Sequence, residues 1–189
     1  KGLELSLRGR ANDYLTMYAT YAHTKAELTA DAPFLFTAQG EAGSELQDFY
    51  DGKDGDRLPG SAEHQFSFGM TYSQEVFGDK MLDVNYGITA QSDIYTTVGL
   101  RQDGEALPGY AISNLNARIS SETWSVTLYI DNLFDKYAFV STRRNVSDIG
   151  EGLYDSELQP NGTELSRNYG HYILTPRTVG LKFNYKFDM

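Results

Sequence analysis

The chain has 189 residues, of which 16 are Lys or Arg and 26 are Asp or Glu, so its formal net charge is −10. This acidic balance argues against a nucleic-acid partner, because phosphate binding needs clustered basic side chains. The sequence contains no cysteine, which excludes disulfides and thiolate metal sites. No apolar run approaches the length of about 18 residues that a transmembrane helix requires.

Alternating apolar and polar residues predict about seven strands along the chain. Alternation with a period of two gives a strand one apolar and one polar face. The expected strands lie at about 3–8, 14–25, 65–72, 82–91, 110–119, 124–134 and 177–187. The pattern is clearest in the last of these, where the apolar positions are Val179, Leu181, Phe183, Tyr185 and Phe187.

The predicted connections alternate between two lengths. Tight turns at 11–13, 77–80 and 121–123 alternate with longer loops at about 26–61, 97–109 and 138–174. Antiparallel outer-membrane barrels have this asymmetry, with short periplasmic turns and long extracellular loops. The sequence therefore predicts an all-β fold, an antiparallel transmembrane β-barrel segment, with a soluble β-sandwich as the alternative.

An odd number of strands does not close a bacterial single-chain barrel, in which strand numbers are even and begin at about eight. An open sheet would leave unpaired peptide groups in lipid, at a cost of several kcal/mol each. We therefore expect an incomplete barrel wall, with Lys1 internal to a longer protein.

The faces of the predicted strands give further expectations. Arg118 and Lys182 should point into the lumen, where ionised groups are tolerated. Trp124, Tyr185 and Phe187 should lie at the periplasmic rim as interfacial anchors. The lipid-facing set of the second strand is ambiguous, since two sets alternate there: Leu15, Met17, Ala19 and Tyr21, or Tyr14, Thr16, Tyr18 and Thr20.

Several segments resemble motifs of TonB-dependent outer-membrane receptors. Residues 131–137, Asp-Asn-Leu-Phe-Asp-Lys-Tyr, resemble the motif before the last extracellular loop of that family. Residues 175–181, Thr-Pro-Arg-Thr-Val-Gly-Leu, with an aromatic end at Phe187, are similar to its terminal strand. Residues 57–60 and 107–110 fit its loop-to-strand junctions. The chain departs from the family at its end, because Asp188 and Met189 follow the aromatic residue.

The resemblance implies that residues 1–189 are the C-terminal portion of a 22-stranded barrel in the bacterial outer membrane, with the plug domain outside these residues. It implies import of a scarce bulky nutrient, a ferric siderophore or similar chelate or else an oligosaccharide, with energy from the TonB complex. The expected partners are outer-membrane lipid and lipopolysaccharide, the rest of the barrel, the plug, the TonB complex and a small-molecule ligand. No cofactor is expected. A passive substrate-specific porin is the alternative function, and a soluble β-sandwich binding module is a second.

Candidate ligand-binding residues lie in the predicted extracellular loops. Aromatic rings can stack on a sugar or chelate, and cationic groups can attract an anionic ferric chelate. The candidates are Phe49, Tyr50, Arg57, Arg101, Arg143 and Arg144. Each also has an ordinary role open to it, the aromatic residues packing on one another and the arginines pairing with loop carboxylates or lipid phosphates.

Metal and catalytic motifs are sparse in the sequence. Asp51, Asp54 and Asp56 are calcium candidates, although their spacing departs from the EF-hand loop. The histidines, which catalysis would need beside a nucleophile, are His23, His64 and His171. They are expected near the extracellular rim without a nucleophile motif or a two-His zinc spacing, so no enzyme is predicted.

Overall fold

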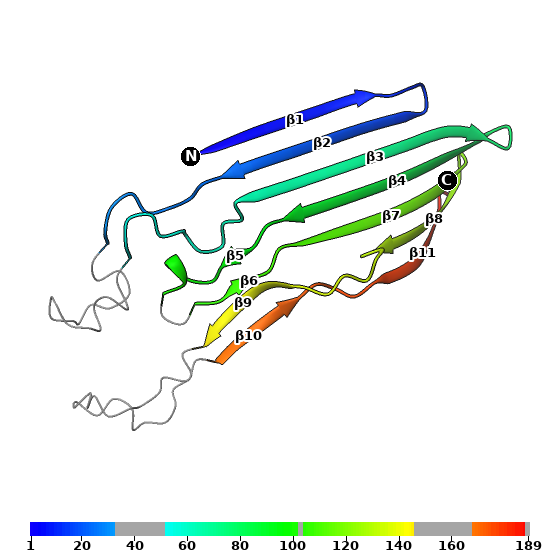
Figure 1. Ribbon diagram of the computed structural model, residues 1–189. Coiled ribbons are helices and arrows are strands. Elements are labelled where there is room, and N and C mark those ends of the chain that lie inside the picture. The colour runs from blue at the N-terminus through cyan, green and yellow to red at the C-terminus, as the bar shows by residue number, and fades with distance from the viewer. Residues whose placement is uncertain (33–51, 102–103, 146–167, 188–189) are drawn as a thin grey trace.

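The computed structural model describes residues 1–32, 52–101, 104–145 and 168–187. Seven strands form one sheet in the order β1-β2-β3-β4-β7-β8-β11, and each pairs antiparallel with its neighbours (Figure 1). Their bounds are Gly2–Arg10, Leu15–Thr24, His64–Val76, Lys80–Gln91, Tyr110–Ser120, Trp124–Asp131 and Thr178–Tyr185. The predicted strands and their antiparallel arrangement are therefore confirmed.

Short turns join the strands at one end of the sheet and long connections join them at the other (Figure 1). In the first short turn, the side-chain oxygen of Asn12 accepts hydrogen bonds from the backbone N–H groups of Tyr14 and Leu15, both at 2.9 Å. This is the local turn chemistry that asparagine favours. In the second, Phe77 and Gly78 both have positive φ, 54° and 86°. The predicted alternation of connection lengths is confirmed. We call the two ends the tight-turn rim and the long-loop rim.

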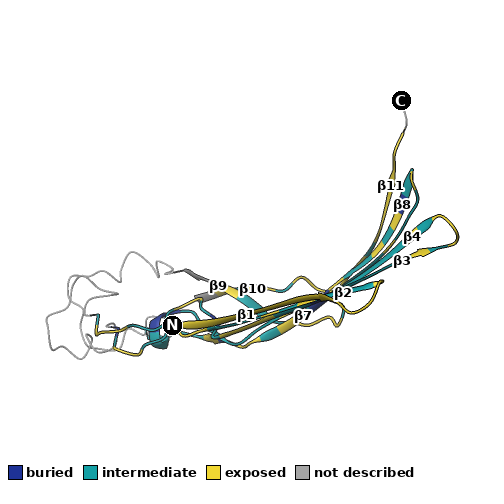
Figure 2. Cartoon of the chain, turned by 90° about the horizontal axis from the view of Figure 1, so that it is seen from above, coloured by how far each residue is buried: buried dark blue, intermediate teal, exposed yellow. Residues whose placement is uncertain are grey.

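The sheet is a single curved layer (Figure 2). One face presents apolar side chains that are largely exposed, among them Leu7 and Leu181 at 74% each. The buried hydrophobic residues in the described part of the chain, Ala62, Val98 and Leu107, lie outside the seven long strands. A soluble sandwich would cover the apolar face with a second sheet. No such layer is present among the residues that the structure describes, which argues against the sandwich alternative and fits a face turned to lipid.

The strand register resolves the ambiguous second strand, because cross-strand partners share a face. Tyr21 pairs with Phe66 and Ala19 with Phe68, and both partners lie on the apolar face of β3. The set Leu15, Met17, Ala19 and Tyr21 therefore faces lipid, and Tyr18 lies on the polar face.

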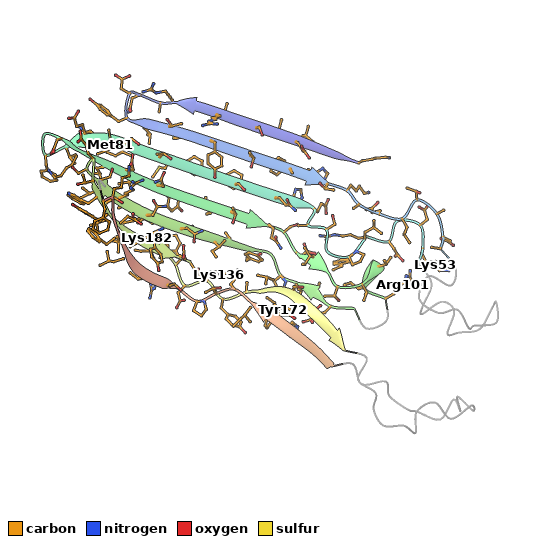
Figure 3. All side chains as sticks on the ribbon, turned by 180° about the vertical axis from the view of Figure 1, so that it is seen from behind. Lys53, Met81, Arg101, Lys136, Tyr172 and Lys182 are labelled. Carbon is orange, nitrogen blue, oxygen red and sulfur yellow. The ribbon has the colours of Figure 1, made fainter. Side chains whose placement is uncertain are left out.

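The register also places the charged and interfacial residues as predicted. Arg118 and Lys182 both pair with Thr127 of β8, on the polar face. Lys182 is labelled in Figure 3. Trp124 pairs with Tyr185 at the tight-turn rim, next to Phe187, whose ring makes an edge contact with that of Tyr185.

Two of the long connections contain strands that the sequence did not predict. In the middle one, β5 (Ile94–Tyr95) pairs with β6 (Ala106–Leu107), with a short helix η1 (Val98–Leu100) between them. No helix within the described ranges has the length and hydrophobicity needed to span a bilayer. The expectation of a plain loop over 138–174 was wrong at both ends, where β9 (Phe139–Asn145) and β10 (Asn168–Ile173) form a hairpin.

The predicted strand at 124–134 ends early, at Asp131, because the chain turns at Asn132. This residue has a positive φ of 52° and is only 1% exposed. Its amide nitrogen donates to the carbonyls of Lys136 and Thr175 at 2.9 and 3.0 Å, and its amide oxygen accepts from the Lys136 N–H at 2.8 Å. Asp135 accepts from the N–H of Arg177 at 2.8 Å. The motif at 131–137 thus fastens the end of β8 to the segment that begins β11.

Candidate functional site at the long-loop rim

The first and second long connections are joined through their backbones at the long-loop rim. The N–H of Gly60 donates to the carbonyl of Tyr95 at 2.9 Å, and the N–H of Gly99 donates to the carbonyl of Arg57 at 3.0 Å. Within the first connection, Leu28 donates to Asp56 and Leu58 to Ala26. These bonds hold the described parts of the two connections together beyond the ends of the strands.

Arg57 links the two connections through its side chain. One guanidinium nitrogen donates to the Asp93 carboxylate at 2.9 Å, and the other donates to the carbonyls of Ser61, at 3.0 Å, and Asp93. The guanidinium also lies 4.6 Å from the centre of the Tyr95 ring, a cation–π contact. The Arg57 side chain is 17% exposed. The guanidinium group of Arg57 therefore binds to groups of the protein itself.

Arg101 and Asp56 form a second link between the same connections. Nε and Nη2 of Arg101 donate to the two oxygens of the Asp56 carboxylate, and both side chains are mostly buried, at 23% and 16% exposure. The backbone N–H of Lys53 also donates to Asp56, at 2.8 Å. Burial raises the pKa of Asp56, but the bonds and charge of Arg101 and the Lys53 N–H outweigh it and hold that pKa below its ordinary value. Figure 3 shows Lys53 and Arg101 at this rim.

The hairpin of the third connection is tied to the second. The Nε2 atom of His171 on β10 lies 2.8 Å from a carboxylate oxygen of Glu105. The ring of Phe139 on β9 lies 4.2 Å from the His171 ring, centre to centre. Side-chain contacts therefore connect all three long connections at the rim.

A further cluster lies where β2 ends and β3 begins. The register pairs His23 with His64, and their rings are stacked with centres 5.0 Å apart. His23 Nε2 lies 3.2 Å from a carboxylate oxygen of Glu63. The hydrogen bond from His23 lowers the pKa of Glu63. The Tyr21 hydroxyl lies 2.9 Å from His64 Nδ1. The sequence analysis missed this cluster because His23 and His64 are far apart in the chain. Their placement opposite each other depends on the register of the two strands, which comes from the structure.

The structure brings some of the predicted site residues together. Arg57 and Arg101 belong to one network of the first two connections. Arg143 and Arg144 lie apart from it, on β9, opposite Gly170 and Tyr169 of β10.

The remaining predicted residues divide between the described and undescribed parts of the chain. Phe49, Tyr50 and Asp51 lie outside the described residues. Of the calcium candidates, Asp56 is engaged by Arg101, and the backbone N–H of Asp54 donates to the Asp31 carboxylate at 2.9 Å. The Asp56 carboxylate is thus already occupied by a cationic group of the protein.

Solved structures resemble this chain over nearly its whole length. The siderophore receptor PiuA from Acinetobacter baumannii is 20% identical, with a TM-score of 0.62, over 98% of this chain and 21% of that one. BauA, the ferric preacinetobactin receptor from the same organism, is 18% identical, with a TM-score of 0.60, over 98% and 22%. The chain therefore spans about a fifth of the length of these receptors, and at this identity the likeness shows the fold alone. No curated protein sequence matches it.

A family match extends from β1 to the junction after β8. Residues 1–133, that is 133 of the 189, match the family described as "TonB dependent receptor-like, beta-barrel". This family consists of outer-membrane transport proteins rather than enzymes, in agreement with the predicted location and with the prediction that the chain is not an enzyme. The single-layer wall, its sorted connections and this match lead to one conclusion: the chain belongs to the TonB-dependent receptor β-barrel family.

Proposed function

We propose that this chain forms part of the wall of a receptor that binds a scarce, bulky nutrient and imports it with energy supplied by TonB. The cargo class that we favour is a ferric siderophore or a similar metal chelate, and an oligosaccharide is the alternative. The observation that carries the proposal is a barrel wall of this family whose three long connections are joined at one rim. The names of the two similar structures, a siderophore receptor and a ferric preacinetobactin receptor, support the choice of cargo.

The polar face of the wall suits a lumen. Ser73 donates to Asp83 and Thr71 donates to Asn85, both at 2.7 Å, and Asn85 continues the ladder to Asn116 at 3.0 Å. These groups satisfy one another across β3, β4 and β7 and form a hydrophilic surface. Such a surface is compatible with the passage of a hydrated solute and with contact to a polar plug. We propose that the plug, the remaining strands and the TonB-contacting segment belong to the same protein outside residues 1–189.

The predicted site residues take different roles in this proposal. Arg57 and Arg101 position the loops, because their guanidinium groups are engaged by Asp93 and Asp56. Arg143 and Arg144, on the hairpin of the third connection, are proposed to attract an anionic chelate at the extracellular mouth. Phe49 and Tyr50 are proposed to stack on the cargo.

Uptake of radiolabelled iron in the native bacterium tests the proposal. A strain lacking the gene, grown under iron limitation, should fail to take up at least one chelate from a panel of ferric siderophores. The natural-length gene should restore that uptake, and removal of TonB should abolish it again. A passive porin would keep the uptake without TonB, and this result would overturn the proposal. TonB-dependent uptake of oligosaccharides alone would reject the cargo class.

A matched pair of variants tests the role of the hairpin arginines. Arg143→Ala combined with Arg144→Ala should raise the chelate concentration needed for half-maximal uptake. Arg10→Ala removes a cation from the tight-turn rim and should leave that concentration unchanged. Equal behaviour of the two variants would contradict a role of Arg143 and Arg144 in cargo capture.

A further inference from the structure

We propose that His23, Glu63 and His64 form a binding site for a first-row divalent transition-metal ion, with Zn²⁺ as the representative ion. The site lies at the long-loop rim, where β2 ends and β3 begins. The inference goes beyond the proposed transport function, because the ion would be a resident of the barrel wall and not its cargo.

The distances within the cluster suit a shared ion. One ligand atom from each of the three residues lies within 4.8 Å of the other two. Zinc–ligand bonds of about 2.1 Å in a tetrahedral arrangement place two ligand atoms roughly 3.4 Å apart. The separation of 3.2 Å between His23 Nε2 and the Glu63 carboxylate oxygen is close to that value. The remaining step is a small shift of the exposed His64 ring, which stays against the rings of Tyr21 and His23.

The backbone fixes the three residues relative to one another. His23 and His64 are direct partners in the β2–β3 ladder. The N–H of Thr24 donates to the carbonyl of Glu63 at 2.8 Å. On the other side, the N–H of His64 donates to the Ser92 hydroxyl at 3.1 Å, and the N–H of Ser92 donates to the carbonyl of His64 at 2.9 Å. Ligands held by sheet strands keep their geometry better than ligands on loops.

The ligand types select the class of metal. Two imidazoles and one carboxylate suit zinc, copper or nickel, whereas magnesium and calcium prefer ligands that are all oxygen. The oxygen of the Tyr21 hydroxyl, 2.9 Å from His64 Nδ1, can accept a hydrogen bond from Nδ1–H. This tautomer leaves Nε2 with the lone pair that a metal needs. Glu63 supplies a negative charge. The field of Arg57 also reaches Glu63, but this arginine is paired with Asp93.

The position of the cluster separates it from the transport path. His23 shares a face with Tyr21, and His64 shares a face with Phe66, so both imidazoles stand on the apolar, outward side of the sheet. Both lie at the ends of their strands, at the level where the wall leaves the hydrocarbon. An ion bound here would clamp β2 to β3 at the base of the first long connection without entering the lumen.

A metal titration tests the site. The protein is purified at its natural length in detergent micelles, without a histidine tag, and is stripped with a chelator. Co²⁺ is then added while its visible absorption is recorded, and Zn²⁺ is used in competition. We expect saturable binding of Co²⁺ that Zn²⁺ displaces. His23→Gln, His64→Gln and Glu63→Gln should each weaken the binding by about tenfold or more, the loss typical of disturbing a metal site.

The matched control is His171→Gln. His171 also pairs with a glutamate, Glu105, at 2.8 Å, but no second imidazole belongs to that pair. Its substitution should leave the Co²⁺ affinity unchanged. The proposed site would be overturned if Co²⁺ binding to the wild-type protein did not saturate, or if the cluster variants bound Co²⁺ as tightly as wild type. An equal loss of Co²⁺ affinity in His171→Gln would also overturn it.

Folding is checked for every variant by the heat-dependent shift in electrophoretic mobility that folded barrels show. Glu63 lies just before β3, so Glu63→Gln leaves the β2–β3 ladder intact. This variant tests the site even where a histidine variant fails to fold. Iron uptake provides an independent readout. If the wild-type protein does not bind Co²⁺ but supports TonB-dependent uptake, the metal site alone is rejected. If the wild-type protein binds Co²⁺ but does not support uptake, the transport proposal alone is rejected.

Discussion

The phenol ring of Tyr129 on β8 covers the backbone of Gly180 on β11, its direct partner in the ladder. A Cβ atom at position 180 would overlap the ring. Tyr18 on β2 covers Gly69 on β3 in the same way. Both pairs lie on the polar face, where the aromatic ring fills the space that a side chain would occupy and shields the glycine backbone.

Gly180→Ala is expected to destabilise the barrel, because the new Cβ displaces the Tyr129 ring from a filled position. The clashing atoms are at the far end of the Tyr129 side chain, which can move aside, so we expect a cost at the lower end of the range of about 1–3 kcal/mol for overpacking. Urea unfolding of the natural-length protein in lipid vesicles measures the change. Gly87→Ala is the control, since Gly87 also lies on the polar face and a Cβ there would have its nearest neighbour at 4.0 Å. Equal unfolding of the two variants would show that the ring does not need the glycine.

Asp56→Ala is expected to loosen the first and second long connections. The substitution removes the carboxylate that accepts two hydrogen bonds from Arg101, whose side chain is 23% exposed. Hydrogen bonds to a charged group contribute about 1.5–3 kcal/mol. Limited proteolysis of intact cells should cut the rim connections faster than in wild type. Asp79→Ala breaks the exposed pair with Lys80 at the tight-turn rim and should leave the cleavage rate unchanged.

The link between Asp56 and Arg101 should depend on pH only in the acid range. Arg101 and the Lys53 N–H lower the pKa of Asp56 in the folded protein below its value of about 3.9 in the unfolded chain. A depressed pKa means that the pairing contributes fully above that unfolded value and is lost as pH falls through the folded-state pKa. Hydrogen exchange at 52–61 and 95–101, corrected for intrinsic rates, should therefore stay slow at pH 7 and 5 and accelerate below about pH 4.

The control for this pH dependence is Asp56→Asn, in which the acid acceleration should disappear. A transition near neutral pH in the wild-type protein would contradict the assignment.

Leu181→Arg tests the assignment of the outward face. Leu181 is 74% exposed, between Val179 and Phe183 on the apolar side of β11. An arginine facing lipid near the midplane should cost about 2–4 kcal/mol and reduce the amount of folded protein in the membrane. Asn184→Arg places the same charge on the polar face, where Asn184 contacts Ser125, and should insert normally. Normal insertion of Leu181→Arg would refute a lipid-facing position.

Most of the fold could be predicted from local patterns in the sequence. The alternation through Leu181 and Phe183, and the turn residues Asn12 and Gly78, act over a few positions, so they are readable from sequence. The β9–β10 hairpin was missed because Ser141, Arg143 and His171 interrupt the apolar alternation on strands of only 7 and 6 residues.

The rim contacts were harder to predict than the strands. Arg57 and Arg101 were singled out for their charge, but their pairing with Asp93 and Asp56 depends on how two connections fold over each other. Neither spacing nor composition encodes that arrangement. The His23–His64 pair follows from strand register, which the sequence leaves open until one face is known to be apolar.

The side chain of Asn132 also has a consequence for how such a protein can diversify. Its amide nitrogen donates to the carbonyls of both Lys136 and Thr175. The two ends of the third long connection are therefore bound to the same side chain. Insertions, deletions or wholesale exchange of the segment between these points need not disturb the pairing of β11 with β8. New recognition loops could therefore be grafted between 137 and 174 while the membrane-spanning part keeps its alignment.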